Sequence, residues 1–163
     1  EHMQTPEPQA EHLWLNQLVG EWIIESECSL GPDQPPMKTT GREVVRRLGK
    51  LWAICEGTLD TPNGGSCGSI MTLGYDPHKQ RFVGTFIASE MTHLWPYNGS
   101  LNTSGKVLTL DSEGPNFSGD GTMAKFQDII EFVAPDYRKL TACVQSADGS
   151  WQQFMTAHYR RQQ

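Results

Sequence analysis

The chain has 163 residues and a formal net charge of −6, and it contains 16 glycines and 10 prolines. That length fits a single domain, and the negative charge, which no basic stripe offsets, argues against nucleic acid as a partner. No apolar run approaches the roughly 20 residues that a membrane-spanning helix needs, so we expect no membrane span.

Residues 1–10 are rich in proline, glutamine and glutamate, and we expect them to form a disordered arm. Glu1-His2 in front of Met3 is typical of a cloning remnant. No charged stretch followed by an apolar one opens the sequence, so we expect no signal peptide. Residues 11–163 are therefore predicted to form one domain.

The spacing of the apolar residues changes at Gly20. Before it, residues 12–19 place apolar side chains on one side of a short helix. After it, Trp22 and Ile24 alternate with polar residues, which is typical of a strand with one sheltered face. The glycine allows a sharp turn, and the indole of Trp22 is large enough to fill the space beneath. The sequence therefore predicts a short N-terminal helix that caps the first strand.

The rest of the chain alternates short strands with turns. Turn signals such as Asn63-Gly64 and Asp148-Gly149 separate the strands, and nothing in the pattern indicates a crossover helix. Two connections, 30–40 and 113–121, are longer and rich in turn-forming residues, as lids and tolerated insertions are. The predicted strands after the first are 41–48, 51–59, 68–75, 81–89, 92–101, 106–111, 124–133, 138–146 and 151–160.

About ten strands joined by hairpin-length turns are too many for one flat sheet, and closing the sheet removes both of its edges. We therefore predict an all-β fold, a closed antiparallel up-and-down β-barrel of about ten strands with a short N-terminal helix. A barrel of this size either encloses a cavity for one small ligand or is filled by its own side chains.

Alternation assigns an inward face to several of these strands. Strands 41–48 and 51–59 stay ambiguous, because both faces of the first are charged and Glu56 shares a face with Trp52 and Ile54 in the second. If Phe154 on the last strand points outward, it is an exposed aromatic of the kind that packs on the N-terminal helix or on a second subunit, and this favours a homodimer. The inward sets are His93, Trp95 and Tyr97 in 92–101, Leu108 and Leu110 in 106–111, Phe126, Asp128, Ile130 and Phe132 in 124–133, and Leu140, Ala142 and Val144 in 138–146.

Asp128 is the one carboxylate on an otherwise apolar inward face. Desolvating a bare charge costs several kcal/mol, so the group must be paired, hydrogen-bonded or protonated. Its candidate partners are Arg42, Arg46, His93 and the hydroxyl of Tyr97. Asp128 is therefore either part of a buried structural pair, or turned outward by a bulge, or a polar anchor that orients a ligand in the cavity.

Two histidines are candidate functional residues. His93, between aromatic residues, is either a satisfied interior residue or a group that binds a ligand carbonyl, carries a proton or ligates haem iron. His158 on the last strand is a second candidate axial ligand. The sequence has no His-x-His or His-Glu-x-x-His spacing, nucleophile elbow, P-loop or dinucleotide fingerprint. It therefore supports no metal site and no cofactor, and it identifies no catalytic residue.

The four cysteines are Cys28, Cys55, Cys67 and Cys143, and no two of them form a Cys-x-x-Cys pair. Scattered single cysteines favour buried free thiols in a cytoplasmic protein over a disulfide framework or a structural zinc site. A secreted protein whose signal has been removed is the alternative.

Several stretches together resemble a known superfamily. Gly20-x-Trp22 after a short helix resembles the Gly-x-Trp signature that opens lipocalin-like (calycin) barrels. Over residues 11–161 the chain is similar to an uncharacterised, largely bacterial family of domains of unknown function in that superfamily. The resemblance implies the barrel and brings no established activity. The stretches that carry it are 18–22, 31–37, 71–77, 81–86, 91–95 and 153–161.

Two other branches of that superfamily suggest ligands. Fatty-acid-binding barrels hold a carboxylate with an Arg-x-Tyr pair near the C-terminus, and here Tyr159 and Arg161 share a face in the reversed order. Nitrobindin-like haem barrels carry a late histidine, which His158 resembles. Further glycines follow their Gly-x-Trp, however, where this chain has Ile24 and Ser26. A shared fold does not settle function.

The leading hypothesis is a carrier or sensor, and not an enzyme, that binds a small apolar or amphipathic ligand inside the barrel. The alternatives are an isomerase or hydrolase with His93 and Asp128 as acid and base, a haem protein that uses His158 or His93, and an interaction module with a filled interior. The residues expected to bind the ligand are Trp22, His93, Trp95, Tyr97, Phe126, Asp128, Phe132, Tyr159 and Arg161.

Overall fold

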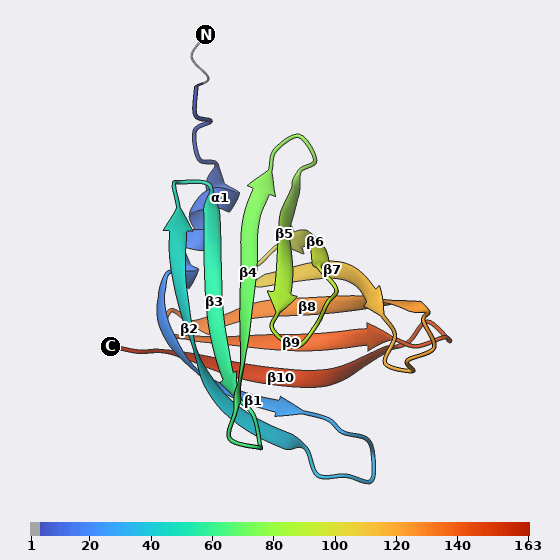
Figure 1. The fold of residues 1–163 in the computed structure, drawn as a ribbon. Coiled ribbons are helices and arrows are strands. Elements are labelled where there is room, and N and C mark those ends of the chain that lie inside the picture. Colours follow the sequence, from blue (N-terminus) through green and yellow to red (C-terminus); the bar gives the residue numbers. More distant parts are fainter. Residues whose placement is uncertain (1–3) are drawn as a thin grey trace.

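The computed structural model describes residues 4–163 as a meander of ten antiparallel strands that close into a barrel (Figure 1). The presumed cloning remnant Glu1-His2 lies outside the described residues. Two short helical segments, α1 (Ala10–Trp14) and the 3-10 turn η1 (Leu15–Leu18), precede the barrel. The strands are β1 (Gly20–Cys28), β2 (Met37–Leu48), β3 (Trp52–Asp60), β4 (Ser66–Asp76), β5 (Arg81–Ala88), β6 (Trp95–Leu101), β7 (Val107–Pro115), β8 (Met123–Ala134), β9 (Tyr137–Gln145) and β10 (Trp151–Arg161).

β1 closes the barrel because it pairs with β2 on one side and with β10 on the other. The predicted fold is thereby confirmed. Three strand ends differ from their predicted positions. β2 begins inside the predicted loop 30–40 because Met37 pairs with Cys28, and β7 runs on to Pro115 because it follows β8. β6 begins only at Trp95, so His93 lies in the loop before it.

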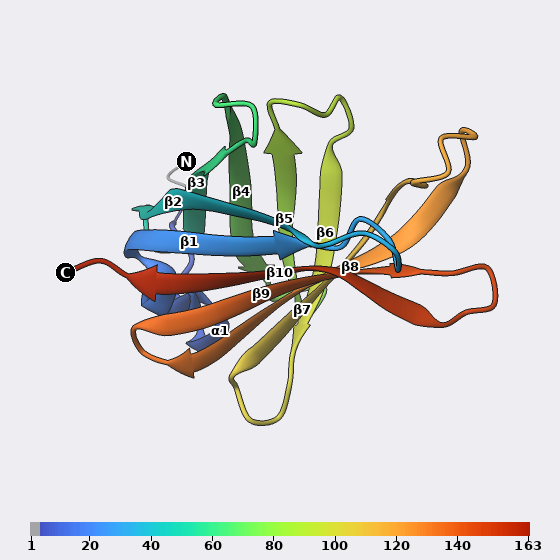
Figure 2. The ribbon, with the colours of Figure 1, turned by 90° about the horizontal axis from the view of Figure 1, so that it is seen from below.

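The two ends of the barrel differ in their connections (Figure 2). The closed end carries α1, η1, the C-terminal end of β10 and the short turns 49–51, 77–80, 102–106 and 135–136. The open end carries the connections 29–36, 61–65, 89–94, 116–122 and 146–150. In Figure 2 the β7–β8 and β9–β10 hairpins project away from the side where α1 and the C-terminus lie.

The helical segments are held at the closed end by contacts to the barrel, since a helix this short is not stable alone. Leu15 and Leu18 are fully buried. The indole Nε1 of Trp14 donates a 2.6 Å hydrogen bond to the carbonyl of Gly105, and that of Trp22 donates one of 2.9 Å to the carbonyl of Leu18. Trp22 has no exposed surface, so the predicted filling of the space beneath Gly20 is confirmed.

Aromatic side chains fill the interior above Trp22. The rings of Trp14 and Phe132 pack edge to face with centroids 5.7 Å apart, and those of Tyr75 and Phe82 do so at 5.2 Å. Edge-to-face contacts of this kind stabilise a core beyond the area that they bury. The closed half of the barrel therefore holds a buried aromatic core.

A buried ion pair stands beside this aromatic core. The guanidinium of Arg138 on β9 donates to the carboxylate of Glu43 on β2, and the Arg138 side chain is only 3% exposed. The Arg138 guanidinium carbon also lies 4.5 Å from the ring centre of Trp22 and 4.0 Å from that of Tyr159. Glu43 thus faces inward, which resolves the ambiguity of strand 41–48.

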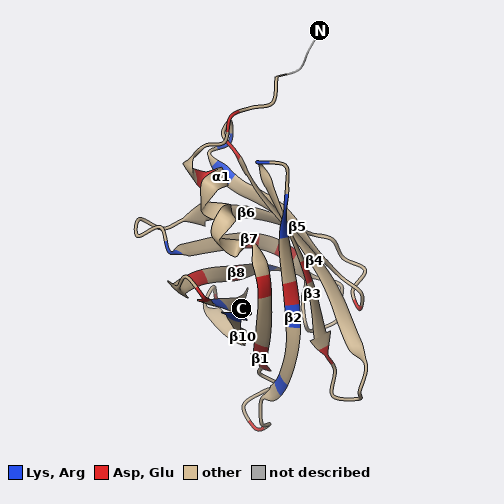
Figure 3. Cartoon of the chain, turned by 90° about the vertical axis from the view of Figure 1, so that its left-hand side faces the viewer, with Lys and Arg blue, Asp and Glu red and all other residues tan. Residues whose placement is uncertain are grey.

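Strand 51–59 is resolved in the same way. Ala53 and Cys55 are buried, so the face that Glu56 shares with Trp52 is the outer one. Glu56 forms an exposed ion pair with Arg46 at 3.3 Å. Figure 3 colours the charged residues on the ribbon, and in that view residues of both signs are scattered over the strands without forming a continuous band. Neither helical segment within residues 4–163 has the length and hydropathy to span a bilayer.

Candidate ligand cavity

A cavity of about 200 Å³ lies in the open half of the barrel. Its lining is mostly aromatic and aliphatic, and its few oxygen atoms come from Tyr97, Ser112 and Asp128. Such a combination of apolar walls and a few polar groups is typical of small-molecule sites. The lining residues are Met71, Phe86, Met91, Trp95, Tyr97, Ser112, Phe117, Phe126, Asp128, Leu140, Ala142, Phe154 and Met155.

Asp128 is the polar centre of the cavity. It is half-buried on the inward face of β8, and its side chain lines the cavity. Its Oδ2 accepts a short hydrogen bond from the hydroxyl of Tyr97. Desolvation raises the pKa of Asp128, and the hydrogen bond from Tyr97 opposes that shift. Of the candidate partners, the structure selects Tyr97.

Tyr97 remains a hydrogen-bond donor under ordinary conditions. Burial raises its pKa well above the usual value, and the neighbouring charge of Asp128 raises it further. The phenol therefore keeps its proton and directs it at the carboxylate. This fixes one oxygen of Asp128 and leaves the other free to meet a ligand.

Aromatic rings form the wall toward the open end. The rings of Trp95 and Phe126 lie edge to face with centroids 4.8 Å apart. The indole of Trp95 lies over Gly114, where an added Cβ would come within 2.0 Å of the ring. Phe117, from the connection between β7 and β8, is 66% exposed and still lines the cavity. Its ring packs edge to face against Phe154, with centroids 4.9 Å apart, so it covers part of the cavity from the solvent side.

Phe154 does not point outward. The register between β9 and β10 shifts between Gln153 and Met155, so Phe154 is an extra residue in a β-bulge. The bulge turns this ring toward the cavity, where it packs near Phe126 with centroids 6.2 Å apart. The homodimer expectation depended on this side chain being exposed, and it loses that support.

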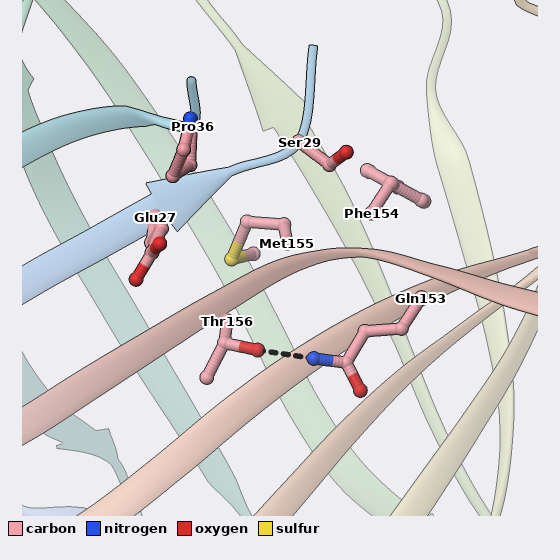
Figure 4. A pocket seen from close by; sticks show the side chains of 7 residues that line it. All are labelled: Glu27, Ser29, Pro36, Gln153, Phe154, Met155 and Thr156. Atoms are coloured by element: carbon pink, nitrogen blue, oxygen red, sulfur yellow. Dashed lines mark hydrogen bonds between the residues drawn. The ribbon is translucent and has the colours of Figure 1, made fainter. Parts of the chain in front are cut away.

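A second hollow, of about 300 Å³, lies on the outer side of the same bulge (Figure 4). Phe154 and Met155 line both spaces and thereby separate them. The amide of Gln153 donates a 2.5 Å hydrogen bond to Thr156 Oγ1 at its edge. Because its polar groups partly satisfy one another and it holds no buried charge of the Asp128 kind, we regard the inner cavity as the candidate site.

The structure does not bring the two predicted histidines into the cavity. His93 Nε2 lies 2.9 Å from the carbonyl oxygen of Glu113, and its ring packs edge to face on Trp95 at 4.7 Å. His158 is on the outer face of β10, where its Nδ1 lies 2.7 Å from the hydroxyl of Tyr137. No group of three or more histidine, cysteine or acidic side chains within residues 4–163 is placed to hold a metal ion.

Four other predicted site residues lie at the closed end. Trp22 and Phe132 belong to the packed aromatic core, and Tyr159 lies under Arg138. Arg161 donates to the carbonyl oxygens of Val19 and Gln17 at 2.6 and 2.7 Å. The Tyr159–Arg161 arrangement therefore braces the chain end and does not reach the cavity. Trp95, Tyr97, Phe126 and Asp128 are the predicted residues that do line it.

The comparison of sequences supplies a family. A family described as "Protein of unknown function (DUF1579)" matches residues 7–161. The chain belongs to the DUF1579 family. This agrees with the resemblance to a lipocalin-like family of unknown function. No curated protein is similar enough in sequence to count as a match.

Solved structures share the fold of this DUF1579 chain. Rv2717c from M. tuberculosis is similar with a TM-score of 0.62 at 13% identity, over 96% of this chain and 100% of that one. The structure of EF1p2_mFAP2b bound to DFHBI is similar with a TM-score of 0.51 at 13% identity, over 94% of this chain and 100% of that one. At these identities the likeness concerns the barrel alone.

Sequence reasoning missed several residues of the DUF1579 cavity. Phe117 carried a signal, because a large aromatic in a loop of glycine, serine and asparagine needs an apolar neighbour. Phe86 and Met155 lie on strands whose faces were left unassigned. Met91 lies in the loop before β6, where alternation assigns no face. Phe154 lies in a β-bulge, which the sequence pattern does not reveal.

Proposed function

We propose that this protein binds a small, mostly apolar molecule in the cavity of its open half. The observation that carries the proposal is an apolar cavity whose lining includes the half-buried carboxylate of Asp128, held by the hydroxyl of Tyr97. A buried charge with one free oxygen is costly without a ligand. An occupant with a matching polar group would reduce that cost, so Asp128 is proposed to orient the ligand.

The volume limits the class of ligand. Sites for drug-sized molecules enclose roughly 300 to 1,000 Å³, whereas this cavity measures about 200 Å³. An engineered apolar cavity of roughly 150 Å³ in another protein binds benzene. The proposed ligand is therefore a molecule of one or two rings, and long-chain lipids and tetrapyrroles are too large for the space. The fold relative bound to DFHBI supports the idea that a barrel of this type can hold a small dye ligand.

The geometry does not favour the enzyme or haem alternatives. A His93–Asp128 acid–base pair would need both side chains at the cavity, and the imidazole of His93 is engaged by the backbone of Glu113 instead. Haem ligation through His158 would need that residue inside the barrel, and it lies outside, against Tyr137. Binding without chemistry is therefore the function that we propose.

Intrinsic fluorescence tests this proposal, because Trp95 lines the cavity. Toluene is a suitable fluorescence probe, because it does not absorb at the red edge of tryptophan absorption. Naphthalene absorbs and emits near tryptophan, so its binding is followed by calorimetry. Binding should shift or quench the emission, and Trp95→Phe should remove the response. Trp52→Phe is the matched control, since Trp52 lies on the outer face. The proposal fails if calorimetry detects no binding of either probe and native mass spectrometry finds no bound mass.

A further inference from the structure

The hydroxyl groups that face the cavity already donate their hydrogen bonds to other groups of the protein. The hydroxyl of Tyr97 donates to Asp128, and the hydroxyl of Ser112 donates to the carbonyl of Pro96 at 2.7 Å. The indole N–H of Trp95 has no partner within the described residues, but the atom has no accessible surface and cannot reach a ligand. The free positions are therefore the lone pairs of Asp128, Tyr97 and Ser112. These atoms require a ligand that donates hydrogen bonds.

The carboxylate of Asp128 also lacks a counter-ion. Among residues 4–163, no lysine, arginine or histidine lines the cavity. Arg138 is already held by Glu43 at the closed end. A carboxylate ligand would bring a like charge next to Asp128, whereas a cationic ligand would supply the missing positive charge. The raised pKa of Asp128 agrees with a site that lacks a cation.

The other lining residues suit a ligand that carries an ammonium group on an aromatic ring. Aromatic rings surround the cavity and attract a cation through their faces, while their edges and the methionine side chains pack against an apolar ring. The space of about 200 Å³ accommodates one ring with a short chain. The rings are those of Phe86, Trp95, Tyr97, Phe117, Phe126 and Phe154.

We infer that the ligand is a small aromatic amine compound, with one ring and a short alkylammonium chain, whose N–H groups donate to the free oxygen of Asp128. This inference rests on the proposed binding function, and it specifies the class of ligand that the cavity binds. Tyr97 lines the same cavity and holds the other oxygen of Asp128 through its hydroxyl. No covalent step is involved.

Three probes with the same ring and chain separate the possible ligands. They are 2-phenylethylamine, propylbenzene and 3-phenylpropionate, which end in an ammonium, a methyl and a carboxylate group. Calorimetry with the unaltered protein should find the amine bound about 10-fold or more tightly than propylbenzene, because a hydrogen bond to a charged group is worth that much. The carboxylate should bind more weakly than both.

Asp128→Asn should lower the affinity for the amine about 10- to 100-fold and leave that for propylbenzene within about 3-fold. Asp111→Asn is the matched control, since it removes a carboxylate from the outer face of β7, where Asp111 accepts from Gln127 at 2.9 Å. That variant should leave the affinities for all three probes unchanged. If Asp128→Asn does not fold, the three-probe comparison on the unaltered protein decides alone.

The outcomes distinguish this inference from the function beneath it. If propylbenzene or the carboxylate binds as tightly as the amine, or if Asp128→Asn leaves the amine affinity unchanged, the cavity is a binding site and the amine inference is wrong. If none of the three probes binds, and naphthalene and toluene do not bind either, the proposed binding function is wrong and the inference falls with it.

Discussion

At the closed end of the barrel the carboxylate of Glu43 meets the guanidinium of Arg138, whereas in the open half the carboxylate of Asp128 meets only the hydroxyl of Tyr97. Both acids lie on inward faces and both are withdrawn from bulk water. The first has a counter-ion, and the second has a neutral hydrogen-bond donor and lines a cavity. This difference is the reason for proposing that the first acid stabilises the fold and that the second binds a ligand.

The same contrast extends to the side chains around each acid. At the closed end, Trp22 and Arg138 are almost completely buried, and short turns connect the strands. In the open half, Phe117 and Met91 line the cavity while remaining substantially exposed. Stability and binding are thus expected to respond to different substitutions, which the following experiments separate.

The largest expected effect is the loss of stability on breaking the buried ion pair. Glu43→Gln leaves the guanidinium of Arg138 buried without a counter-ion, which should cost about 3–5 kcal/mol in the free energy of unfolding. Glu56→Gln breaks the exposed pair with Arg46 and should cost less than about 1 kcal/mol. Urea denaturation measures both. Equal losses for the two variants would contradict the structural part assigned to Glu43.

Two phenylalanines on β8 offer the next comparison, since Phe126 and Phe132 face inward and are 6% and 7% exposed. Phe132→Ala removes a ring packed against Trp14 and Trp22 and should cost about 3–5 kcal/mol. Phe126→Ala should cost less, because one side of that ring already faces empty space. It should also enlarge the cavity, so that naphthalene binds more tightly relative to toluene. If Phe126→Ala proves the costlier substitution, the open half is not hollow.

A smaller effect, with a characteristic pH dependence, is expected for Asp128→Asn. Burial raises the pKa of Asp128 in the folded state. Between the pKa of the unfolded chain, about 4, and this raised value, the folded protein binds more protons, so its stability falls as the pH rises through that window. Asparagine cannot ionise. The variant without ligand should therefore have a higher Tm than the parent at pH 7, and the difference should vanish as the pH falls toward 4. A lower Tm at pH 7 would show that the charge of Asp128 stabilises the fold.

The smallest effect on stability is expected at the edge of the cavity. Phe117→Ala alters a ring that is 66% exposed, so the free energy of unfolding should change by about 0.5 kcal/mol or less. The ring covers part of the cavity, and its loss should raise the rates of ligand binding and release several-fold in stopped-flow fluorescence. Leu94→Ala is the control, because Leu94 is exposed in the neighbouring loop and does not line the cavity. Equal rates in the parent and the Phe117 variant would exclude this covering action.

Much of the closed end could be predicted from local sequence. The change of period at Gly20 and the indole two residues later identified the helix, the first strand and the buried Trp22. The Glu43–Arg138 pair could not be predicted, because strand 41–48 carries charge on both faces. Only the register with β1, which sets Glu43 opposite Trp22, decides which face is inward. That information depends on pairing between distant segments.

The candidate site was predictable to the extent that its strands alternate regularly. Period-two alternation placed Tyr97, Phe126 and Asp128 on the inward face, and the structure has them there. His93 was misplaced because the predicted strand 92–101 begins only at Trp95, two residues after His93. The orientation of Phe154 could not be predicted, because an extra residue in β10 interrupts the alternation. Single-residue irregularities of this kind leave no mark in the hydrophobic pattern.

The bulge in β10 also offers this family a means of diversification. An extra residue in one strand exchanges which side chains face the interior, and it does so without altering the pairing that closes the barrel at Arg161 and Trp22. A relative with the bulge one position earlier or later would present a different side chain to the same space. An alignment without gaps across 151–156 would then place residues that face opposite ways in the same alignment column. The residues that line the cavity of each relative must therefore be identified from its strand register and not from the alignment column.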